Sequence, residues 1–341
     1  MQVNQNVNLS EYSTMRLGGV ADYIVEVGSR NEVKWAVDWA DKYNLPVVMI
    51  GEGSNIIWRD EGFRGLVIVN KVRGITVSGE FDYGTYLTAG AGENWDNFVA
   101  KTIDMGLSGV EFLSLIPGTV GATPVQNVGA YGAEAKDVIT VIEAYDKQAK
   151  SFVTIRGSEC DFGYRTSRFK TTDNGRYFIT FVTFMLKPTN PEPPFYSALQ
   201  QYLDDNKLTE YTSQVIRNAV IDIRRNKLPD PAVVANNGSF FANPIIEEAQ
   251  YLQLAANYPD IPHWNVDGGM IKLSAAWMVE QAGFKDFHDT ETGMATWSKQ
   301  PLILINERAQ STSQLIAFRD NLLQAVSQKF GVTLEQEPVL I

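Results

Sequence analysis

The sequence has few of the residues that build disulfides and metal centres. Only one of its 341 residues is a cysteine, Cys160, and only two are histidines, His263 and His288. A single cysteine excludes an internal disulfide and is compatible with a reducing compartment. Together with two histidines it is too little for a thiolate or histidine-rich metal centre. We therefore predict no metal site.

Positive charge and long apolar runs are also scarce. With 29 basic against 40 acidic residues the net charge is −11, which disfavours nucleic acid or an anionic membrane as a partner. The longest near-apolar stretch, residues 178–186, is far shorter than the roughly 20 residues of a membrane span. The polar residues 1–14 show no signal-peptide pattern. We expect a cytoplasmic protein that holds any anionic ligand with a few local cations and backbone N–H groups.

The composition is that of an ordinary globular protein, 44% hydrophobic and 20% charged, and the length suggests roughly two to three domains. Alternation and apolar runs predict strands at 21–27, 45–50, 67–69, 75–77, 86–89, 138–145, 152–155, 178–186, 301–306 and 332–337. Helical spacing and capping residues predict helices from 29, at 95–105, 198–206, from 212, at 274–281 and at 311–330.

Two glycine-rich segments could bind a ligand through their backbone. Gly51-Glu52-Gly53-Ser54-Asn55 places two glycines around one residue, which lets N–H groups approach an anion as a nest. A plain tight turn explains the same residues, and the spacing is that of neither a dinucleotide fingerprint nor a P-loop. The segment 116–132 is the most glycine-dense part of the chain and carries no charged residue. That composition favours contact with a flat or phosphorylated ligand over an ordinary surface loop.

Two further segments carry side chains that could bind a ligand or take part in catalysis. Arg165 and Arg168 lie three residues apart among aromatic residues, and they could clamp a carboxylate or phosphate or form ordinary surface ion pairs. Ser239 stands between a glycine and two phenylalanines, so its hydroxyl could be held rigidly as a proton donor. On the pattern alone, a strand that opens with two core phenylalanines and leaves the serine in a turn is the favoured explanation.

Taken in order, these motifs resemble the UDP-N-acetylenolpyruvoylglucosamine reductase (MurB) family. The resemblance runs from about Thr14 to Glu337, and residues 187–217 with Tyr196 are similar to the insertion of its tyrosine-loop subclass. The motifs that carry it are Gly51 to Asn55, Ile116-Pro117-Gly118 with 126–132, Phe162-Gly163-Tyr164-Arg165, Asn237 to Pro244 and Leu334 to Glu337. The chain departs from the family at Ala242, where a lysine is common, and Pro338 follows Glu337 close to the end of the chain.

The resemblance implies an α+β fold with three domains. Residues 1–70 and 71–226 would form the two FAD-binding subdomains of a vanillyl-alcohol-oxidase-like fold, and residues 227–341 a C-terminal α+β substrate-binding domain. It also implies a monomeric flavoenzyme that binds FAD non-covalently and uses NADPH as co-substrate. The implied reaction reduces UDP-N-acetylglucosamine enolpyruvate to UDP-N-acetylmuramate for bacterial cell-wall synthesis.

The resemblance also implies roles for individual residues. The catalytic residues would be Ser239 as proton donor, Arg165 as partner of the developing negative charge, and Glu337 to polarise the substrate carboxylate or orient the intermediate. The FAD diphosphate and ribityl chain would contact Gly51, Glu52, Gly53, Ser54, Asn55, Ile116, Pro117, Gly118, Thr119, Gly121 and Ala122. The isoalloxazine would lie near Gln126, Asn127, Gly129, Ala130, Tyr131 and Gly132. The substrate would be bound by Tyr164, Tyr196, Lys227, Gly238, Asn243 and Gln300.

The chemistry of this reaction suits these residue types. Side chains cannot transfer a hydride, so a flavin must deliver it, from N5 to the β-carbon of the enolpyruvyl group. Negative charge then develops at the α-carbon, where a guanidinium can stabilise it and a positioned hydroxyl can protonate it. Two other classes stay open: an FAD-linked oxidase of the same cofactor fold, and a non-catalytic module that binds a nucleotide sugar and carries no flavin.

Overall fold

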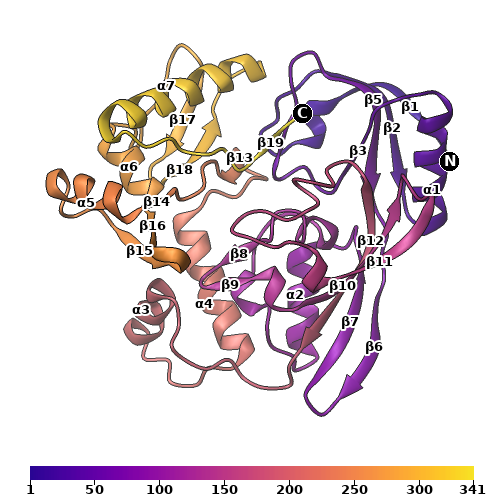
Figure 1. Ribbon diagram of the computed structural model, residues 1–341, viewed down its shortest axis with the longest axis horizontal. Coiled ribbons are helices and arrows are strands. Elements are labelled where there is room, and N and C mark those ends of the chain that lie inside the picture. The colour runs from indigo at the N-terminus through magenta and orange to yellow at the C-terminus, as the bar shows by residue number, and fades with distance from the viewer. The chain divides into compact units, whose positions relative to one another are not determined.

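A computed structural model describes residues 1–341, and the chain separates into two compact units (Figure 1). The first unit comprises Met1–Val7, Ala21–Glu52 and Phe63–Asn226. The second unit comprises Asn8–Val20, Gly53–Gly62 and Lys227–Ile341. Two short N-terminal segments therefore belong to the same compact unit as the C-terminal third of the chain, and the glycine loop 51–55 is divided after Glu52.

The first unit begins with a four-stranded sheet in the order β1-β2-β5-β3. Its strands are β1 (Asn4–Asn8), β2 (Val20–Val27), β5 (Phe63–Asn70) and β3 (Val47–Ile50). β5 lies between β2 and β3 and pairs parallel with both, which explains its nearly continuous apolar run. Helix α1 (Arg30–Lys42) follows β2 and begins where the Ser29 side chain accepts the Glu32 N–H. Its apolar face and this sheet share one hydrophobic core.

A larger antiparallel sheet completes the first unit, in the order β11-β10-β12-β7-β6. Its strands are β11 (Ser151–Arg156), β10 (Ile139–Asp146), β12 (Tyr177–Leu186), β7 (Gly84–Gly90) and β6 (Ile75–Phe81). Helix α2 (Trp95–Asp104) packs its aromatic side chains on this sheet, with the Phe98 and Phe184 rings 4.8 Å apart. The short pair β8 (Gly129–Ala130) and β9 (Ala133–Glu134) lies in the glycine-rich segment.

The predicted insertion, residues 187–217, lies in a helical subdomain of the first unit that continues past residue 217. This subdomain contains α3 (Ser197–Asp205) and α4 (Ser213–Lys227), drawn in salmon in Figure 1. The two helices share a small core of Leu199, Leu203, Ile216, Ala219 and Val220, against which Tyr131 and Phe195 pack. The insertion is therefore an ordered layer attached to the glycine-rich segment that contains Tyr131.

The second unit contains two three-stranded antiparallel sheets, β13-β18-β17 and β14-β16-β15. The strands are β13 (Ala235–Ser239), β18 (Gln300–Asn306), β17 (Met294–Trp297), β14 (Ile245–Glu247), β16 (Met270–Leu273) and β15 (His263–Val266). The helices are α5 (Glu248–Asn257), α6 (Ala275–Gln281) and α7 (Thr312–Phe330). β4 (Ile56–Ile57) pairs parallel with β19 (Val339–Leu340). The core includes Met15 and Ile57 from the N-terminal segments, together with Phe240 and Phe241.

Most predicted elements are confirmed, including helix starts capped by Ser29, Ser274 and Ser311. The strand expected at 332–337 is wrong: this stretch makes only an isolated bridge at Gln336, and the ladder forms at β19. Six single 3₁₀ turns lie at Leu9–Tyr12, Glu111–Leu113, Val120–Ala122, Ala135–Asp137, Gly157–Glu159 and Asp267–Gly269. None of the helices combines the length and apolarity needed to cross a bilayer.

Candidate active site

Parts of two predicted cofactor loops come together in the first unit. The Glu52 carboxylate accepts hydrogen bonds from the Gly118 N–H at 3.1 Å and from the Asn94 amide at 3.0 Å. A Cβ on Gly51 would lie 2.3 Å from the Thr119 hydroxyl, so only glycine fits there. The acidic side chain in this loop is thus bound by protein donors. The Gly118 N–H is used internally and is not available to a phosphate.

The glycine loop has the chemistry expected of a phosphate site. The N–H groups of Gly51 and Glu52 in the first unit, and of Gly53 in the second, make no hydrogen bond within the chain. Unpaired backbone N–H groups of this kind suit an anion. Gly53 has a φ of 71°, and a Cβ there would lie 2.1 Å from the Tyr12 carbonyl oxygen. The unpaired N–H groups of Gly51 and Glu52 in the first unit therefore fit the diphosphate of FAD.

Arg165 lies at the tip of a tight turn. Gly163 and Thr166 exchange backbone hydrogen bonds across it, at 3.1 and 3.4 Å. The φ of Arg165 is 56°, which is uncommon for a side chain of this size. Its guanidinium donates to the Gly129 carbonyl at 2.7 Å, and a Cβ on Gly129 would come within 2.9 Å of Nη1. The turn and the predicted isoalloxazine segment therefore lie side by side in the first unit.

Asn127 supports this arrangement from inside. It is completely buried, and its amide donates to the Gly163 carbonyl and to the Glu134 carboxylate, each at 3.0 Å. Its Oδ1 accepts the Lys136 N–H at 3.0 Å. Because every polar atom of the side chain already has a protein partner, any contact between Asn127 and a cofactor would come from its backbone.

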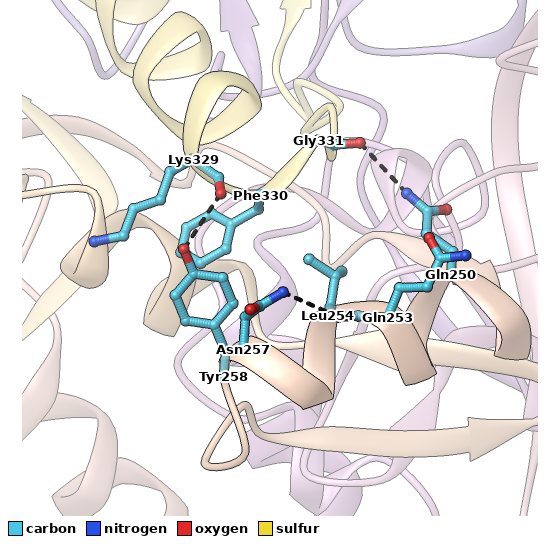
Figure 2. A pocket seen from close by; sticks show the side chains of 8 residues that line it. All are labelled: Gln250, Gln253, Leu254, Asn257, Tyr258, Lys329, Phe330 and Gly331. Atoms are coloured by element: carbon cyan, nitrogen blue, oxygen red, sulfur yellow. Dashed lines mark hydrogen bonds between the residues drawn. The ribbon is translucent and has the colours of Figure 1, made fainter.

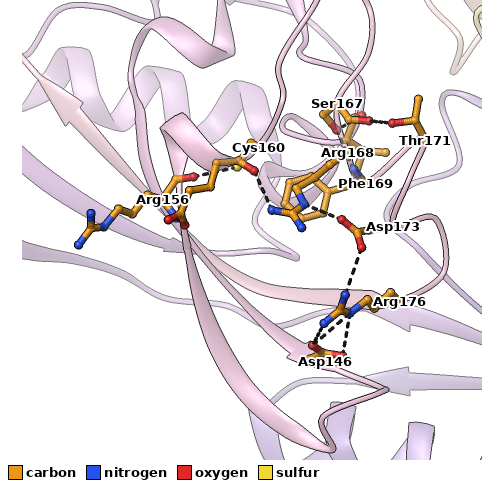
Figure 3. A network of polar contacts seen from close by, with 11 residues as sticks. Asp146, Arg156, Cys160, Ser167, Arg168, Phe169, Thr171, Asp173 and Arg176 are labelled. Atoms are coloured by element: carbon orange, nitrogen blue, oxygen red, sulfur yellow. Dashed lines mark hydrogen bonds and ion pairs between the residues drawn. The ribbon is translucent and has the colours of Figure 1, made fainter.

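The second arginine of this segment has a structural role. Arg168 Nε donates to Asp173 at 2.6 Å, Asp173 also pairs with Arg176, and Arg176 binds both carboxylate oxygens of Asp146 (Figure 3). The hydrogen bonds from Arg176 hold the pKa of Asp146 below its usual range. The two-arginine clamp considered from the sequence is therefore not formed, and of this pair only Arg165 remains a candidate for binding an anion.

Three tyrosines predicted at the site lie in the first unit. The rings of Tyr131 and Tyr196 meet edge to face, with centroids 6.1 Å apart. The Arg165 guanidinium lies 5.2 Å from the Tyr164 ring centroid. Arg224 from α4 interacts with Tyr131, and its Nε is buried without a hydrogen-bond partner. Burial lowers the pKa of Arg224 and raises that of Tyr131. A guanidinium with an unused buried donor suits an anionic ligand group.

Ser239 ends β13 at a β-bulge in the second unit. Asn236 pairs with Ile305 and Ser239 pairs with Ile303, so three steps along β13 oppose two along β18. Gly238, with a φ of 72°, takes up the extra residue. The Asn236 Oδ1 accepts the Gly238 N–H at 2.9 Å and fixes the bulge. Ser239 is exposed and its hydroxyl has no partner in the chain, so a free hydroxyl is carried on a fixed backbone.

Glu337 is fixed beside this serine segment. Its N–H donates to the Phe240 carbonyl at 2.9 Å, and the Ala242 N–H donates to the Glu335 carbonyl at the same distance. The Asn55 amide donates to the Glu337 carbonyl at 3.4 Å. The second unit thus brings the residue after Ser239, the C-terminal tail and part of the glycine loop together.

The remaining predicted substrate residues of the second unit differ in how far their side chains are engaged by the protein. The Lys227 side chain is exposed, and its carbonyl accepts the Trp297 indole N–H at 3.1 Å. Trp297 pairs with Gln300 at the tip of the β17–β18 hairpin, which brings Lys227 to this hairpin. The Asn243 Oδ1 accepts the Ala275 N–H at 3.0 Å and so caps α6. A ligand would therefore meet Asn243 through its amide nitrogen.

Sequence reasoning missed three residues that organise these groups. Asn237 belongs to the motif Asn237 to Pro244, but the sequence suggests no role for it. Thr14 marks only the start of the family resemblance. Arg224 reads as one more residue of the predicted helix from 212. An arginine pair just before Lys227, in a chain poor in basic residues, was a usable signal for Arg224. The contacts of Asn237 and Thr14 join segments 223 residues apart, and no local pattern encodes them.

A surface hollow of the second unit lies away from these residues. It has a volume of about 650 Å³ between α5 and the end of α7 (Figure 2), and it contains none of the predicted site residues. Its polar groups largely bind each other, since Gln250 donates to the Gly331 carbonyl at 3.3 Å and Tyr258 to the Lys329 carbonyl at 3.4 Å. We therefore assign the candidate site to the motif residues.

Comparisons with known proteins agree with the motifs. Residues 21–154 match the family model of an FAD binding domain, and residues 230–341 match that of the C-terminal domain of UDP-N-acetylenolpyruvoylglucosamine reductase. The UDP-N-acetylenolpyruvoylglucosamine reductase of Ralstonia nicotianae is 40% identical over 98% of this chain and 97% of the relative. That of Pseudomonas putida is 38% identical over 100% of this chain and 99% of the relative.

A solved structure shares the fold. The UDP-N-acetylenolpyruvylglucosamine reductase of Thermus caldophilus is 22% identical, with a TM-score of 0.69 over 100% of this chain and 99% of the other. The predicted α+β fold, with an FAD-binding part and a C-terminal domain, is confirmed, and so is FAD as the cofactor. The chain belongs to the UDP-N-acetylenolpyruvoylglucosamine reductase family and is an FAD-dependent oxidoreductase.

Proposed function

We propose that this protein reduces UDP-N-acetylglucosamine enolpyruvate to UDP-N-acetylmuramate, with NADPH as the electron donor, in the cytoplasmic synthesis of peptidoglycan precursors. Bound FAD would supply the two-electron chemistry, accepting a hydride from NADPH and delivering it to the enolpyruvyl β-carbon. Relatives named for this reductase over nearly the full chain support the proposal. The observation that carries it is the free hydroxyl of Ser239 on a backbone fixed by the bulge.

Arg165 would stabilise the negative charge of the reaction. Addition of a hydride to the β-carbon places a second negative charge next to a carboxylate that is already ionised. A guanidinium held by a tight turn and by the Gly129 carbonyl is directed before the charge develops. Preorganisation of this kind contributes about 3–4 kcal/mol to stabilising a transition state.

Ser239 would donate the proton to the α-carbon. One hydride and one proton then add across the double bond, and the serine alkoxide recovers its proton from solvent, to which Ser239 is exposed. An ordinary hydroxyl is a weak acid, but the carbanion-like species beside it is a much stronger base than water. Because the hydroxyl has no partner in the chain, its proton is free to rotate toward the substrate.

Glu337 would assist from the tail that is hydrogen-bonded beside the serine segment. It could polarise the substrate carboxylate or orient the intermediate. An ionised carboxylate would repel both, so we propose that Glu337 is protonated or paired with a cation while it acts.

We propose that hydrogen-bond donors among the motif residues and on α4 bind the nucleotide diphosphate of the substrate. In the first unit, Tyr196 and the unused Nε donor of Arg224 suit phosphate oxygens. In the second unit, Lys227, Gln300 and the amide nitrogen of Asn243 provide further donors.

The half-reactions of the flavin test the role of Ser239. In Ser239→Ala, reduction of the bound flavin by NADPH should continue at nearly the wild-type rate. Reoxidation by the enolpyruvyl sugar should slow by about 10²–10⁴-fold, the usual value of general-acid assistance. Stopped-flow absorbance of the flavin measures both steps. Ser327→Ala removes another exposed serine hydroxyl of the second unit, on α7, and should change neither step. Equal slowing of both half-reactions in Ser239→Ala would make Ser239 structural.

The same absorbance measurement separates the other functions. A reductase is yellow, is bleached by NADPH and regains its colour with the enolpyruvyl sugar. An FAD-linked oxidase would regain its colour rapidly with oxygen and a sugar or alcohol substrate, without NADPH. A binding module would purify without colour.

A further inference from the structure

Asn237 joins three distant segments of the second unit. It is 6% exposed, and its Nδ2 donates to the Thr14 hydroxyl at 3.0 Å, to the Ser54 carbonyl at 3.2 Å and to the Ile56 carbonyl at 3.4 Å. The latter two carbonyls flank Asn55 in the predicted cofactor loop. One buried amide therefore ties the segment at Thr14 and the loop at 54–56 to the strand that ends in Ser239.

The backbone around Asn237 strengthens this connection. The Asn236 N–H donates to the Thr14 carbonyl at 3.1 Å, and the Asn236 side chain holds the Gly238 N–H. Only one residue, Gly238 of the bulge, lies between Asn237 and Ser239 along the chain. A shift of the loop at 54–56 would therefore reach Ser239 through Gly238, because the Asn236 side chain holds the N–H of that glycine.

The other polar atom of this side chain has no partner. Asn237 Oδ1 is buried and accepts no hydrogen bond. Buried polar atoms in folded proteins are nearly always satisfied, by protein, by ordered water or by a ligand. A buried acceptor next to a predicted cofactor loop suits an N–H or O–H donor of the bound cofactor.

We propose that Asn237 is a positioning residue: its Nδ2 fixes Ser239 relative to the loop at 54–56, and its Oδ1 accepts a hydrogen bond from bound FAD. This inference rests on the proposed function. It assigns no new chemical step, since the proton still comes from Ser239. Its consequence is that cofactor binding and the placement of the proton donor depend on the same amide.

The chain offers a matched control in Asn306. This asparagine lies on the neighbouring strand β18, is half-buried, and donates from its Nδ2 to the Met15 and Ala309 carbonyls, each at 3.3 Å. Its Oδ1 is likewise buried without a partner. Asn306 thus shares with Asn237 an amide bonded to backbone carbonyls and a buried Oδ1 without a partner, and it makes no bond to the loop at 54–56.

The test compares Asn237→Ala with Asn306→Ala in the full-length holoenzyme. Both variants should lower the melting temperature by a similar amount. Only Asn237→Ala should weaken FAD binding, by about tenfold as for one lost hydrogen bond, measured by flavin fluorescence during reconstitution of the apoprotein. In Asn237→Ala saturated with FAD, reoxidation by the enolpyruvyl sugar should slow by about 10–100-fold, while reduction by NADPH stays within about threefold. Matching profiles in the two variants would overturn the proposal.

Thr14→Val provides a second variant that keeps shape and volume. It removes one acceptor of the Asn237 amide and should slow reoxidation by about 3–10-fold, as expected for a weakened hydrogen bond. Because both residues act through one contact, the double variant should be no slower than Asn237→Ala alone. Additive effects would contradict the proposal. If the wild-type protein is not bleached by NADPH, the proposed function fails, and the FAD affinities still test the contact of Oδ1.

Discussion

The Arg165 turn of the first unit and the Ser239 bulge of the second hold their functional groups by opposite means. Arg165 is fixed through its side chain: the guanidinium binds the Gly129 carbonyl, and the backbone adopts a left-handed φ of 56°. Ser239 is fixed only through its backbone, and its hydroxyl is left free. A group that must present charge in one direction gains from a locked side chain. A proton donor instead needs a rotor that can turn.

The residues around the two regions also differ, because ion pairs support the first region and neutral hydrogen bonds support the second. The residues that follow the Arg165 turn are anchored by ions, in the network of Arg168, Asp173, Arg176 and Asp146. Asparagine amides and hydroxyls, which are neutral, anchor the Ser239 bulge. The first region should therefore respond to acid and to charge removal, and the second to the loss of single hydrogen bonds.

Among substitutions at the Arg165 turn, the largest effect is expected from Arg165→Ala. Loss of a preorganised cation at a developing charge costs about 3–4 kcal/mol, or roughly 10²–10³-fold in the rate of flavin reoxidation by the enolpyruvyl sugar. Arg165→Lys should recover only part of this rate, because an ammonium lacks the planar fork. Arg168→Ala is the matched control: it should lower the melting temperature and leave the reoxidation rate within about threefold.

Gly129→Ala displaces the same guanidinium without removing it. The new methyl would lie 2.9 Å from Arg165 Nη1 and 3.0 Å from the Ala133 carbonyl, and the flexible arginine tip will move first. We expect reoxidation to slow by about 10–100-fold, as for a misplaced catalytic group, with a small change in melting temperature. Gly28→Ala, where the methyl meets only Glu32 Oε2 at 3.5 Å, should be neutral. A wild-type rate in Gly129→Ala would show that Arg165 needs no fixed position.

Gly238→Ala tests the bulge with a smaller change. A Cβ at Gly238 would meet no atom within 4 Å, so only the φ of 72° opposes it. That strain is worth about 1–2 kcal/mol, and we expect reoxidation to fall by less than tenfold. Gly238→Asn should be milder, because asparagine tolerates left-handed backbone. Stopped-flow rates and thermal unfolding together measure both effects. A loss in Gly238→Ala as large as that of Ser239→Ala would mean that the bulge collapses.

Much of the fold could be predicted because its signals are local. The Ser29 and Ser311 caps and the apolar run of β12 are written in consecutive residues. The tail 332–337 shows the limit of this reasoning. Its apolar residues alternate because Val332 and Leu334 are buried in the core. Such alternating burial occurs here in an extended segment that forms no strand ladder. The membership of Gly53–Gly62 in the second unit depends on contacts across the whole chain, which no periodicity contains.

The candidate site was predictable to a similar extent. The ordered motifs singled out Ser239, Arg165 and the glycine loop as candidates. They could not separate Arg165 from Arg168, because that distinction depends on Asp173 as a partner for one of them. The bulge at Gly238 and the contacts of Asn237 also depend on strand register and on residues far away in the sequence. Local patterns identify the reactive groups, and long-range contacts decide which of them are held in place.

The last test uses acidic pH to distinguish stability that comes from ion pairs from stability that comes from neutral hydrogen bonds. The hydrogen bonds from Arg176 lower the pKa of Asp146 in the folded protein. Stability from a lowered carboxyl pKa is fully present above the unfolded value of about 3.9 and is lost as pH falls through the folded value. Asp146→Asn should therefore destabilise the protein by about 1–2 kcal/mol at pH 7, and the difference from wild type should shrink below about pH 4.

Asn236→Ala is the neutral counterpart at the Ser239 bulge. Its side chain, 2% exposed, holds the Gly238 N–H and the Val234 carbonyl, and none of these groups titrates. The loss of unfolding free energy in Asn236→Ala should therefore stay constant as the pH falls, while the loss in Asp146→Asn declines. Chemical unfolding of wild type and both variants between pH 7 and pH 3 measures the two costs side by side. Parallel curves would show that the ionic network contributes no charge-dependent stability, and the contrast between the two regions would then reduce to geometry alone.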